Sequence, residues 1–249
     1  MTTRLELLKR FYGQMLPGKV KLESRYHGFA FLEALKSKGA ILEYGQLTDF
    51  ELVHKYKLAN VTDALLDELL WWHLSKECNV CLYFNEDANS VFCLNLDNNH
   101  QRNNTELTAE MRFTIDFLAN FMTDLGIEPL IIASGRGYHV WNRLEEPVCN
   151  HDLYHLMLRI SAQAMAALHE RSLDYRTIKF NLYPNLQIVD VVSLRLFGSE
   201  HVKNQVFSFV WTPEGILDED ASWRYFEAYL GGKTLSKQQF LKATGRLAL

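Results

Sequence analysis

The sequence predicts an α/β protein (α+β) in which helices flank a mixed β-sheet. Short apolar runs of strand length, such as 79–84, 130–133 and 187–192, alternate along the chain with longer segments of helical periodicity. The clearest helix spans 105–125, where apolar residues recur every three or four positions. Internal repeats, low-complexity segments and an obvious linker are all absent from the sequence, which favours one continuous fold.

Composition places the chain among ordinary folded proteins. It has 249 residues, of which 48% are hydrophobic and 22% charged, enough to bury a sizeable core. The formal net charge is −4, so a nucleic-acid partner would require a local basic patch. Charged residues in the first ten positions argue against a signal-peptide core, and no apolar run reaches the roughly 18 residues of a membrane span. We therefore expect a soluble, cytoplasmic protein that does not enter membranes.

Residues 1–78 are expected to form a helical and mixed N-terminal part. Its helices are predicted near 5–12, 29–38 and 61–74, the last capped by Thr62 or Asp63. The pattern between 40 and 57 allows no assignment. The pair Trp71-Trp72 is interpreted as core or interface in preference to a base-stacking platform.

Residues 79–211 alternate strands with helices, and residues 212–249 are predicted to be helical. The predicted strands are 79–84, 91–97, 129–133, 187–192 and 206–211, and the predicted helices are 105–125, 152–171, 221–230 and 236–244. This order makes 79–211 the candidate catalytic core.

The four cysteines do not suggest a metal or redox centre. Cys78 and Cys81 form one Cys-x-x-Cys without the second pair that a structural zinc site needs, and Cys93 and Cys149 stand alone. Packing is the favoured role, because free cysteine behaves as a small hydrophobe in apolar runs.

A glycine-rich loop carries the first candidate site residues. The stretch 134–141 reads Ser-Gly-Arg-Gly-Tyr-His-Val-Trp and follows a buried strand. Its glycines allow close backbone approach, so Ser134 and Arg136 could face a phosphate, while His139 begins the next strand. A Ser134–His139 nucleophile and base pair is disfavoured, because no third orienting carboxylate is implied.

Two strands carry aspartates. Alternation places Asn95 and Asp97 on one face of the strand 91–97. Asp190 lies in a Val/Ile run, where a buried charge needs a partner. Arg195 is one candidate partner, and the other is a divalent cation shared with Asp97.

Cationic side chains could supply the phosphate-binding half of such a site. They are Arg136, Arg195, Lys203, His139 and His201. Taken singly, each is also compatible with an ordinary solvated polar face.

In this order the motifs resemble the archaeo-eukaryotic primase superfamily, the primase-polymerases. The family's first motif is a hydrophobic strand that ends in two acidic residues separated by one position. The second is a glycine loop ending in histidine, the third an aspartate in an apolar strand, and the fourth an arginine followed by Gly-Ser and a lysine. The matching segments here lie between residues 79 and 211.

The resemblance implies one primase-polymerase-like domain over 1–249, with an RRM-like catalytic half flanked by helices. It implies Mg²⁺ or Mn²⁺ as cofactor, with Asn95, Asp97 and Asp190 as metal ligands and with Asp97, Asp190 and His139 as catalytic residues. Nucleotide phosphates would be bound by six residues: Ser134, Arg136, His139, Arg195, Ser199 and Lys203.

The implied activity is metal-dependent synthesis of a DNA or RNA strand, or of a primer. The partners would be nucleoside triphosphates, a single-stranded DNA or RNA template, and a helicase or accessory primase subunit. One position departs from the family, because Asn95 stands where an acidic residue is expected. An asparagine can coordinate through its amide oxygen but brings no charge. The alternative is therefore a catalytically silent module that binds nucleotide or single-stranded nucleic acid, and a third possibility is a plain RRM-like fold with structural aspartates.

Overall fold

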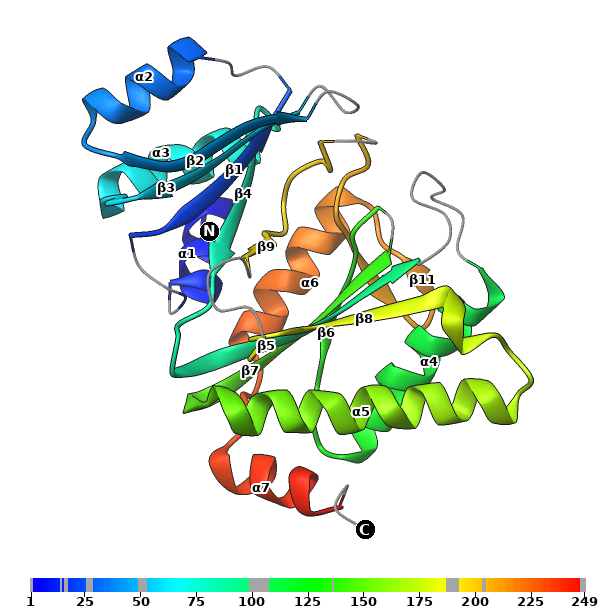
Figure 1. Cartoon of the computed structure of the whole chain (residues 1–249). Helices are drawn as coiled ribbons and strands as arrows, with labels where there is room; N and C mark the ends of the chain where they lie inside the picture. Colours follow the sequence, from blue (N-terminus) through cyan, green and yellow to red (C-terminus); the bar gives the residue numbers. More distant parts are fainter. Residues whose placement is uncertain are drawn as a thin grey trace. The chain divides into compact units, whose positions relative to one another are not determined.

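The computed structural model describes residues 2–13, 15, 18–25, 29–48, 53–98, 108–135, 137–186, 193–202 and 205–246. Their contacts divide the chain into two compact units (Figure 1). The N-terminal unit comprises Met1–Phe84 and Val191–Ser208, and the C-terminal unit comprises Asn85–Asp190 and Phe209–Leu249. Residues 191–208, expected within the catalytic core, thus group with the N-terminal unit.

The N-terminal unit is a five-stranded antiparallel sheet with helices packed against it. Its strands follow the order β2-β3-β1-β4-β9. Its elements are α1 (Arg4–Tyr12), β1 (Val20–Ser24), α2 (Phe29–Ser37), β2 (Ile41–Thr48), β3 (Val53–Ala59), α3 (Asp63–Leu74), β4 (Asn79–Tyr83) and β9 (Ser193–Arg195). The segment that the sequence left unassigned is therefore the β2–β3 hairpin.

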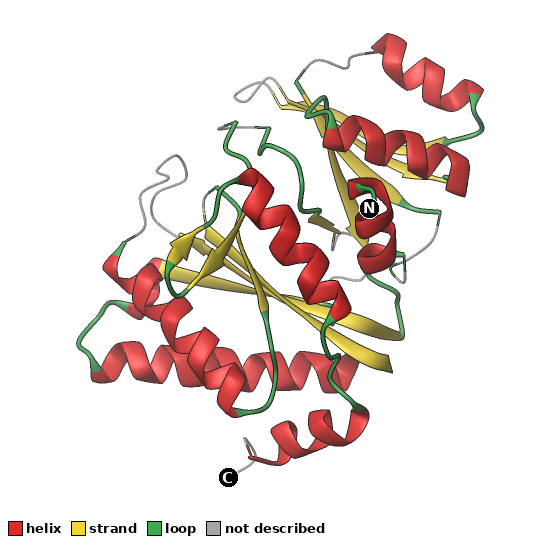
Figure 2. Cartoon of the chain, turned by 180° about the vertical axis from the view of Figure 1, so that it is seen from behind, coloured by secondary structure: helices red, strands yellow, loops and turns green. Residues whose placement is uncertain are grey.

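Local sequence explains where two helices of this unit, α1 and α3, begin. Thr3 and Glu6 form a reciprocal capping box at the start of α1. The side chain of Thr62 accepts the N–H of Leu65, so Thr62, one of the two predicted caps, is the N-cap of α3. Figure 2 shows both helices in front of the strands of this unit.

The C-terminal unit contains a six-stranded sheet of order β11-β10-β6-β7-β5-β8. Its strands are β5 (Ala88–Asn98), β6 (Leu130–Ala133), β7 (Gly137–Cys149), β8 (Ile178–Tyr183), β10 (Phe209–Thr212) and β11 (Gly215–Ile216). Its helices are α4 (Ala109–Asp124), α5 (Asn150–Glu170), the short 3₁₀ helix η1 (Tyr175–Thr177), α6 (Glu219–Gly231) and α7 (Lys237–Arg246).

The order β5-α4-β6-β7-α5-β8 is a β-α-β-β-α-β unit, and its strands lie in the spatial order β6-β7-β5-β8. This is the ferredoxin-like arrangement that RRM domains share, so the predicted RRM-like half is confirmed. The two central strands are β5 and β7.

The ladders between the named strands are antiparallel, whereas the sequence predicted a mixed sheet. Two features explain the difference. The connection between Ala133 at the end of β6 and Gly137 at the start of β7 is too short for a parallel crossover, so the two strands pair as a hairpin. The helix crossovers connect strands that are not neighbours, so they create no parallel pair.

The two faces of this sheet differ in chemistry. Phe92, Leu94 and Leu96 of β5 are buried in a cluster with residues of α4 and α5. The opposite face is covered in part by α6, whose Ser222 hydroxyl accepts the N–H of Val210 on β10. Asn95 and Asp97 of β5 and His139 of β7 lie on that second face.

Several boundaries differ from the predicted ones. Helix α4 begins at Ala109, where Thr108 caps it, and not at 105. Strand β8 was not predicted, and the strand expected at 206–211 is β10, which runs from Phe209 to Thr212. The expected strand 187–192 lies outside the described residues. None of the described helices is both long enough and apolar enough to span a membrane.

Candidate active site

Polar side chains gather on the two central strands and on β8 of the C-terminal sheet. Asn95 of β5 lies directly opposite His139 of β7 on one side and Asn181 of β8 on the other. One step along the same face, Asp97 lies opposite Gly137 and Lys179. Since residues two apart on a strand share a face, these positions form two adjacent cross-strand rows.

Asp97 is held by two amides. The Nδ2 atoms of Asn95 and Asn181 both donate to its Oδ2, at 3.2 Å and 3.0 Å. The predicted proximity of Asn95 and Asp97 is therefore present. Asn181 was missed, because only long-range pairing brings it here from 84 residues away.

The amide oxygen of Asn95 is an orphan. Asn95 is only 7% exposed, and its Oδ1 is buried without a hydrogen-bond partner. Buried acceptors are nearly always satisfied, so this oxygen is available to an electropositive group.

The described residues of this site offer donor atoms that suit a hard cation. Carboxylate and amide oxygens are the donors that Mg²⁺ and Mn²⁺ prefer. Asp97 and Asn95 could therefore hold one such ion. Across the described part of the chain no group of three His, Cys, Asp or Glu residues is positioned to hold a metal. Asp190, the other predicted ligand, lies outside the described residues.

His139 and the loop before it border the same face. The His139 ring lies edge-on to Trp141, with 6.4 Å between centroids. The Ser134 N–H donates to the Gly137 carbonyl at 2.8 Å, which closes the turn between β6 and β7. Gly135 in this turn has φ +91°, a value that favours glycine. Arg136, between the two glycines, lies outside the described residues.

Gly137 is required by packing. A Cβ at this position would overlap the carbonyl oxygen of Leu96 on β5. The second glycine of the loop therefore lets β7 approach β5 closely at Asp97.

The predicted phosphate-binding residues of the fourth motif belong to the N-terminal unit. Arg195 lies on β9 opposite Cys81, and its positive charge contributes to a lowered pKa of Glu23. Burial alone would raise that pKa, and the Lys21 ammonium at 2.8 Å is the main group that outweighs it.

Ser199 is fully buried in the N-terminal unit. Its hydroxyl accepts a hydrogen bond from Asn79 Nδ2 at 3.2 Å and donates to the Cys78 carbonyl at 3.5 Å. These contacts give Ser199 a structural role, and its phosphate contact stays a prediction. Lys203 lies outside the described residues.

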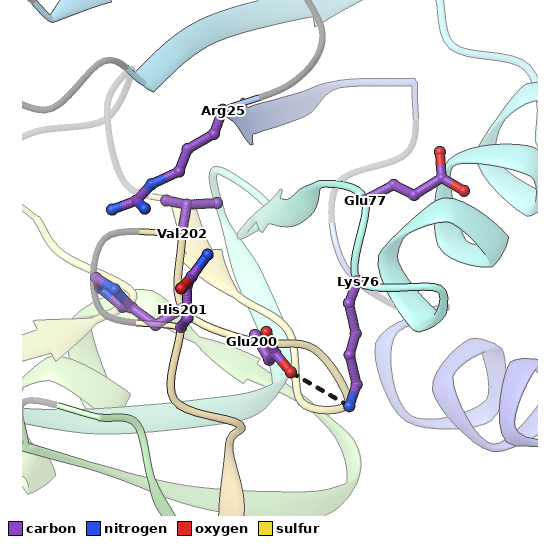
Figure 3. Close-up of a pocket in the computed structure, with 7 residues that line it drawn as sticks. Arg25, Lys76, Glu77, Glu200, His201 and Val202 are labelled. Carbon is purple, nitrogen blue, oxygen red and sulfur yellow. Dashed lines mark ion pairs between the residues drawn. The ribbon is translucent and has the colours of Figure 1, made fainter.

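A small pocket adjoins this motif within the N-terminal unit (Figure 3). It is lined by Arg25, Lys76, Glu77, Glu200, His201, Val202 and Gln205. Lys76 Nζ pairs with Glu200 Oε1 at 3.3 Å, while the Glu77 carboxylate points away from both. The pocket has about 30 Å³ of space, which is enough for water.

Buried cysteines take no part in a site among the described residues. Burial raises the pKa values of Cys78 and Cys81 to about 12, so both stay protonated thiols, which are poor ligands and nucleophiles. Cys93 is buried as well, and Cys149 is exposed.

The chain is similar to the polymerase domain of Ligase D from Mycobacterium tuberculosis, solved in complex with DNA. The TM-score is 0.50 at 13% sequence identity, and the match covers 99% of this chain and 89% of that chain. No protein-family model matches the sequence, and no curated protein matches it either.

This chain shares the fold of that polymerase domain. The predicted fold class is therefore confirmed. At 13% identity the likeness concerns the fold alone, and the site residues rest on the geometry described above.

Proposed function

We propose that the protein is a primase-polymerase-like nucleotidyltransferase that builds a DNA or RNA strand, or a primer, from nucleoside triphosphates on a single-stranded template. One observation carries the proposal. Asn95 and Asp97 from one motif and His139 from another lie in adjacent rows on the central strands of an RRM-like sheet. The primase-polymerase fold supports this choice of reaction.

Each residue has a role that follows from its chemistry. The Asp97 carboxylate supplies negative charge beside the nucleotide phosphates, where Mg²⁺ or Mn²⁺ would be bound together with the Asn95 oxygen. A bound cation of this kind would supply Lewis-acid charge to the phosphate oxygens. His139 donates a hydrogen bond to a phosphate, and the Ser134–Gly137 turn borders the same site. Positioning and charge neutralisation account for most catalysis of this kind.

The remaining predicted residues complete the proposal. Asp190 would add a second carboxylate, and Arg136, Arg195 and Lys203 would bind phosphates. Single-stranded template, nucleoside triphosphates and a helicase or accessory primase subunit are the proposed partners.

The test is incorporation of labelled nucleotide on primed and unprimed single-stranded templates with Mg²⁺ or Mn²⁺. We expect Asp97→Asn to lower the rate by about a thousandfold, since a lost metal ligand costs several kcal/mol of transition-state stabilisation. Asp87→Asn, in the exposed turn before β5, is the matched control and should keep full activity. Normal extension by Asp97→Asn would refute the proposed site.

A second function is favoured by the amides around Asp97. Two of its nearest polar neighbours are neutral, so the site could hold nucleotide or single-stranded nucleic acid without turnover. In that case the wild-type protein incorporates no nucleotide with either metal, yet binds an oligonucleotide whose affinity falls with salt.

A further inference from the structure

A second amide side chain reaches Asp97 from β8. In the C-terminal unit, β8 is the strand that pairs with β5 on the side away from β7. Asn181 lies opposite Asn95 and on the same face as Asp97. The sequence placed the third ligand at Asp190, nine residues further along.

We propose that Asn181 is a metal-site residue, so that the Asp97 carboxylate and the amide side chains of Asn95 and Asn181 together hold a divalent cation. This inference rests on the proposed function, because it concerns the same site. It assigns to that site a residue that the sequence motifs did not indicate.

The contacts of Asp97 support this assignment. Both amides donate to Oδ2 of Asp97, which fixes the carboxylate and leaves its Oδ1 as the oxygen available to an ion. Each amide also carries an oxygen that can coordinate. The Asn95 oxygen is already buried without a partner, and Asn181 is half-buried on the neighbouring strand.

Charge sets the expected strength of the site. One carboxylate brings a single negative charge, and Lys179 lies opposite Asp97 on β8. Mg²⁺ releases its waters reluctantly, so we expect weak Mg²⁺ binding and somewhat tighter Mn²⁺ binding, in line with the general affinity order of divalent ions for such ligands.

The test measures Mn²⁺ binding without nucleotide, by the electron paramagnetic resonance signal of free Mn²⁺ and by the Mn²⁺-dependent shift of the melting temperature. We expect Asn181→Asp to bind Mn²⁺ at least about tenfold more tightly than wild type, a change of about 1.4 kcal/mol. Asn95→Asp should show a similar gain. In the presence of a metal chelator, the melting temperature of Asn181→Asp should be lower than that of wild type, because Asp97 loses a hydrogen-bond donor and faces a second carboxylate. Adding Mn²⁺ should restore the melting temperature.

Asn98→Asp is the matched control. It adds the same charge one residue after Asp97, but alternation directs it to the other face of β5, so its Mn²⁺ affinity should change less than about threefold. Adding Asp97→Asn to Asn181→Asp should abolish the gain. If Asn181→Asp does not fold, two other single variants decide the question. Asn95→Asp should bind Mn²⁺ more tightly than wild type, and Asn181→Ala should bind it more weakly.

The outcomes separate this inference from the proposed function. Mn²⁺ affinity of Asn181→Asp no higher than that of Asn98→Asp overturns the inference, even when wild type incorporates nucleotide. A gain in Mn²⁺ affinity without incorporation by any variant supports the inference and overturns the polymerase function.

Discussion

At the scale of single residues, His139 and Asp97 differ in how their roles can be tested. Asp97 is tied to two amides by hydrogen bonds, whereas His139 lies across from Asn95 at the edge of the same polar row. A change at His139 should therefore affect phosphate binding without disturbing Asp97.

We expect His139→Gln to weaken binding of a nucleoside triphosphate about tenfold to a hundredfold. The reason is the loss of a charge-assisted hydrogen bond to a phosphate, worth about 1.5–3 kcal/mol. Isothermal titration calorimetry measures the effect. His169→Gln, exposed on α5, is the control, and equal affinities of the two variants would contradict the assignment.

His73 makes stability depend on pH. It is fully buried in the N-terminal unit, where its Nδ1 accepts the N–H of Val80 at 3.1 Å. Its Nε2 must then carry the proton that is donated to the Phe197 carbonyl at 3.0 Å. Burial, aided by the charge of Arg195, lowers the pKa of His73 from 6.5 to about 4, so the folded protein keeps a neutral ring.

Because the unfolded chain binds this proton more readily, stability should fall as pH drops from about 6.5 to about 4. The loss amounts to about 3 kcal/mol at the lower limit. His73→Gln should be less stable at pH 7 but should show a flatter pH dependence in that window, measured by urea unfolding at several pH values. A slope as steep as that of the wild type would show that His73 is not responsible.

At the scale of elements, the hairpin of β6 and β7 determines how closely β7 approaches β5. Gly137 leaves no room for a Cβ against Leu96. We expect Gly137→Ala to lower the free energy of unfolding by about 2–3 kcal/mol through overpacking and displaced strands.

The control for this substitution is another glycine-to-alanine change. Gly245 lies in α7, and a Cβ there would meet no atom within 4 Å. Gly245→Ala should therefore be neutral or stabilise by up to about 1 kcal/mol, because alanine favours the helix. Chemical denaturation of both variants provides the comparison, and equal stabilities would contradict the packing argument.

At the scale of the whole molecule, a net charge of −4 must be reconciled with the nucleic-acid partner proposed above. On the sheet of the N-terminal unit, Lys21 lies opposite Lys57 and Lys55 lies opposite Glu23. Lys21 pairs with Glu23 and Lys57 with Glu43, so the three lysines outnumber the two glutamates by one. Such a local patch can attract nucleic acid despite the overall sign of the charge.

We expect binding of single-stranded DNA to weaken with salt, with a log–log slope of about −0.7 for each phosphate contacted. The double variant Lys55→Gln/Lys57→Gln should make the slope less negative by about one unit or more. Lys242→Gln, exposed on α7, should leave it unchanged. Fluorescence anisotropy over a salt series tests this, and a salt-independent affinity would argue against nucleic-acid binding by this face.

The sequence alone determined the fold class and the local part of the site. Helical periodicity and capping residues act between neighbours, so α3 was located to within two residues, with Thr62 as its cap. Strand alternation likewise placed Asn95 and Asp97 on one face. Only the tertiary structure decided the antiparallel register of β5 with β7 and β8. Register depends on packing between segments far apart in the chain, which is why Asn181 could not be recognised beforehand.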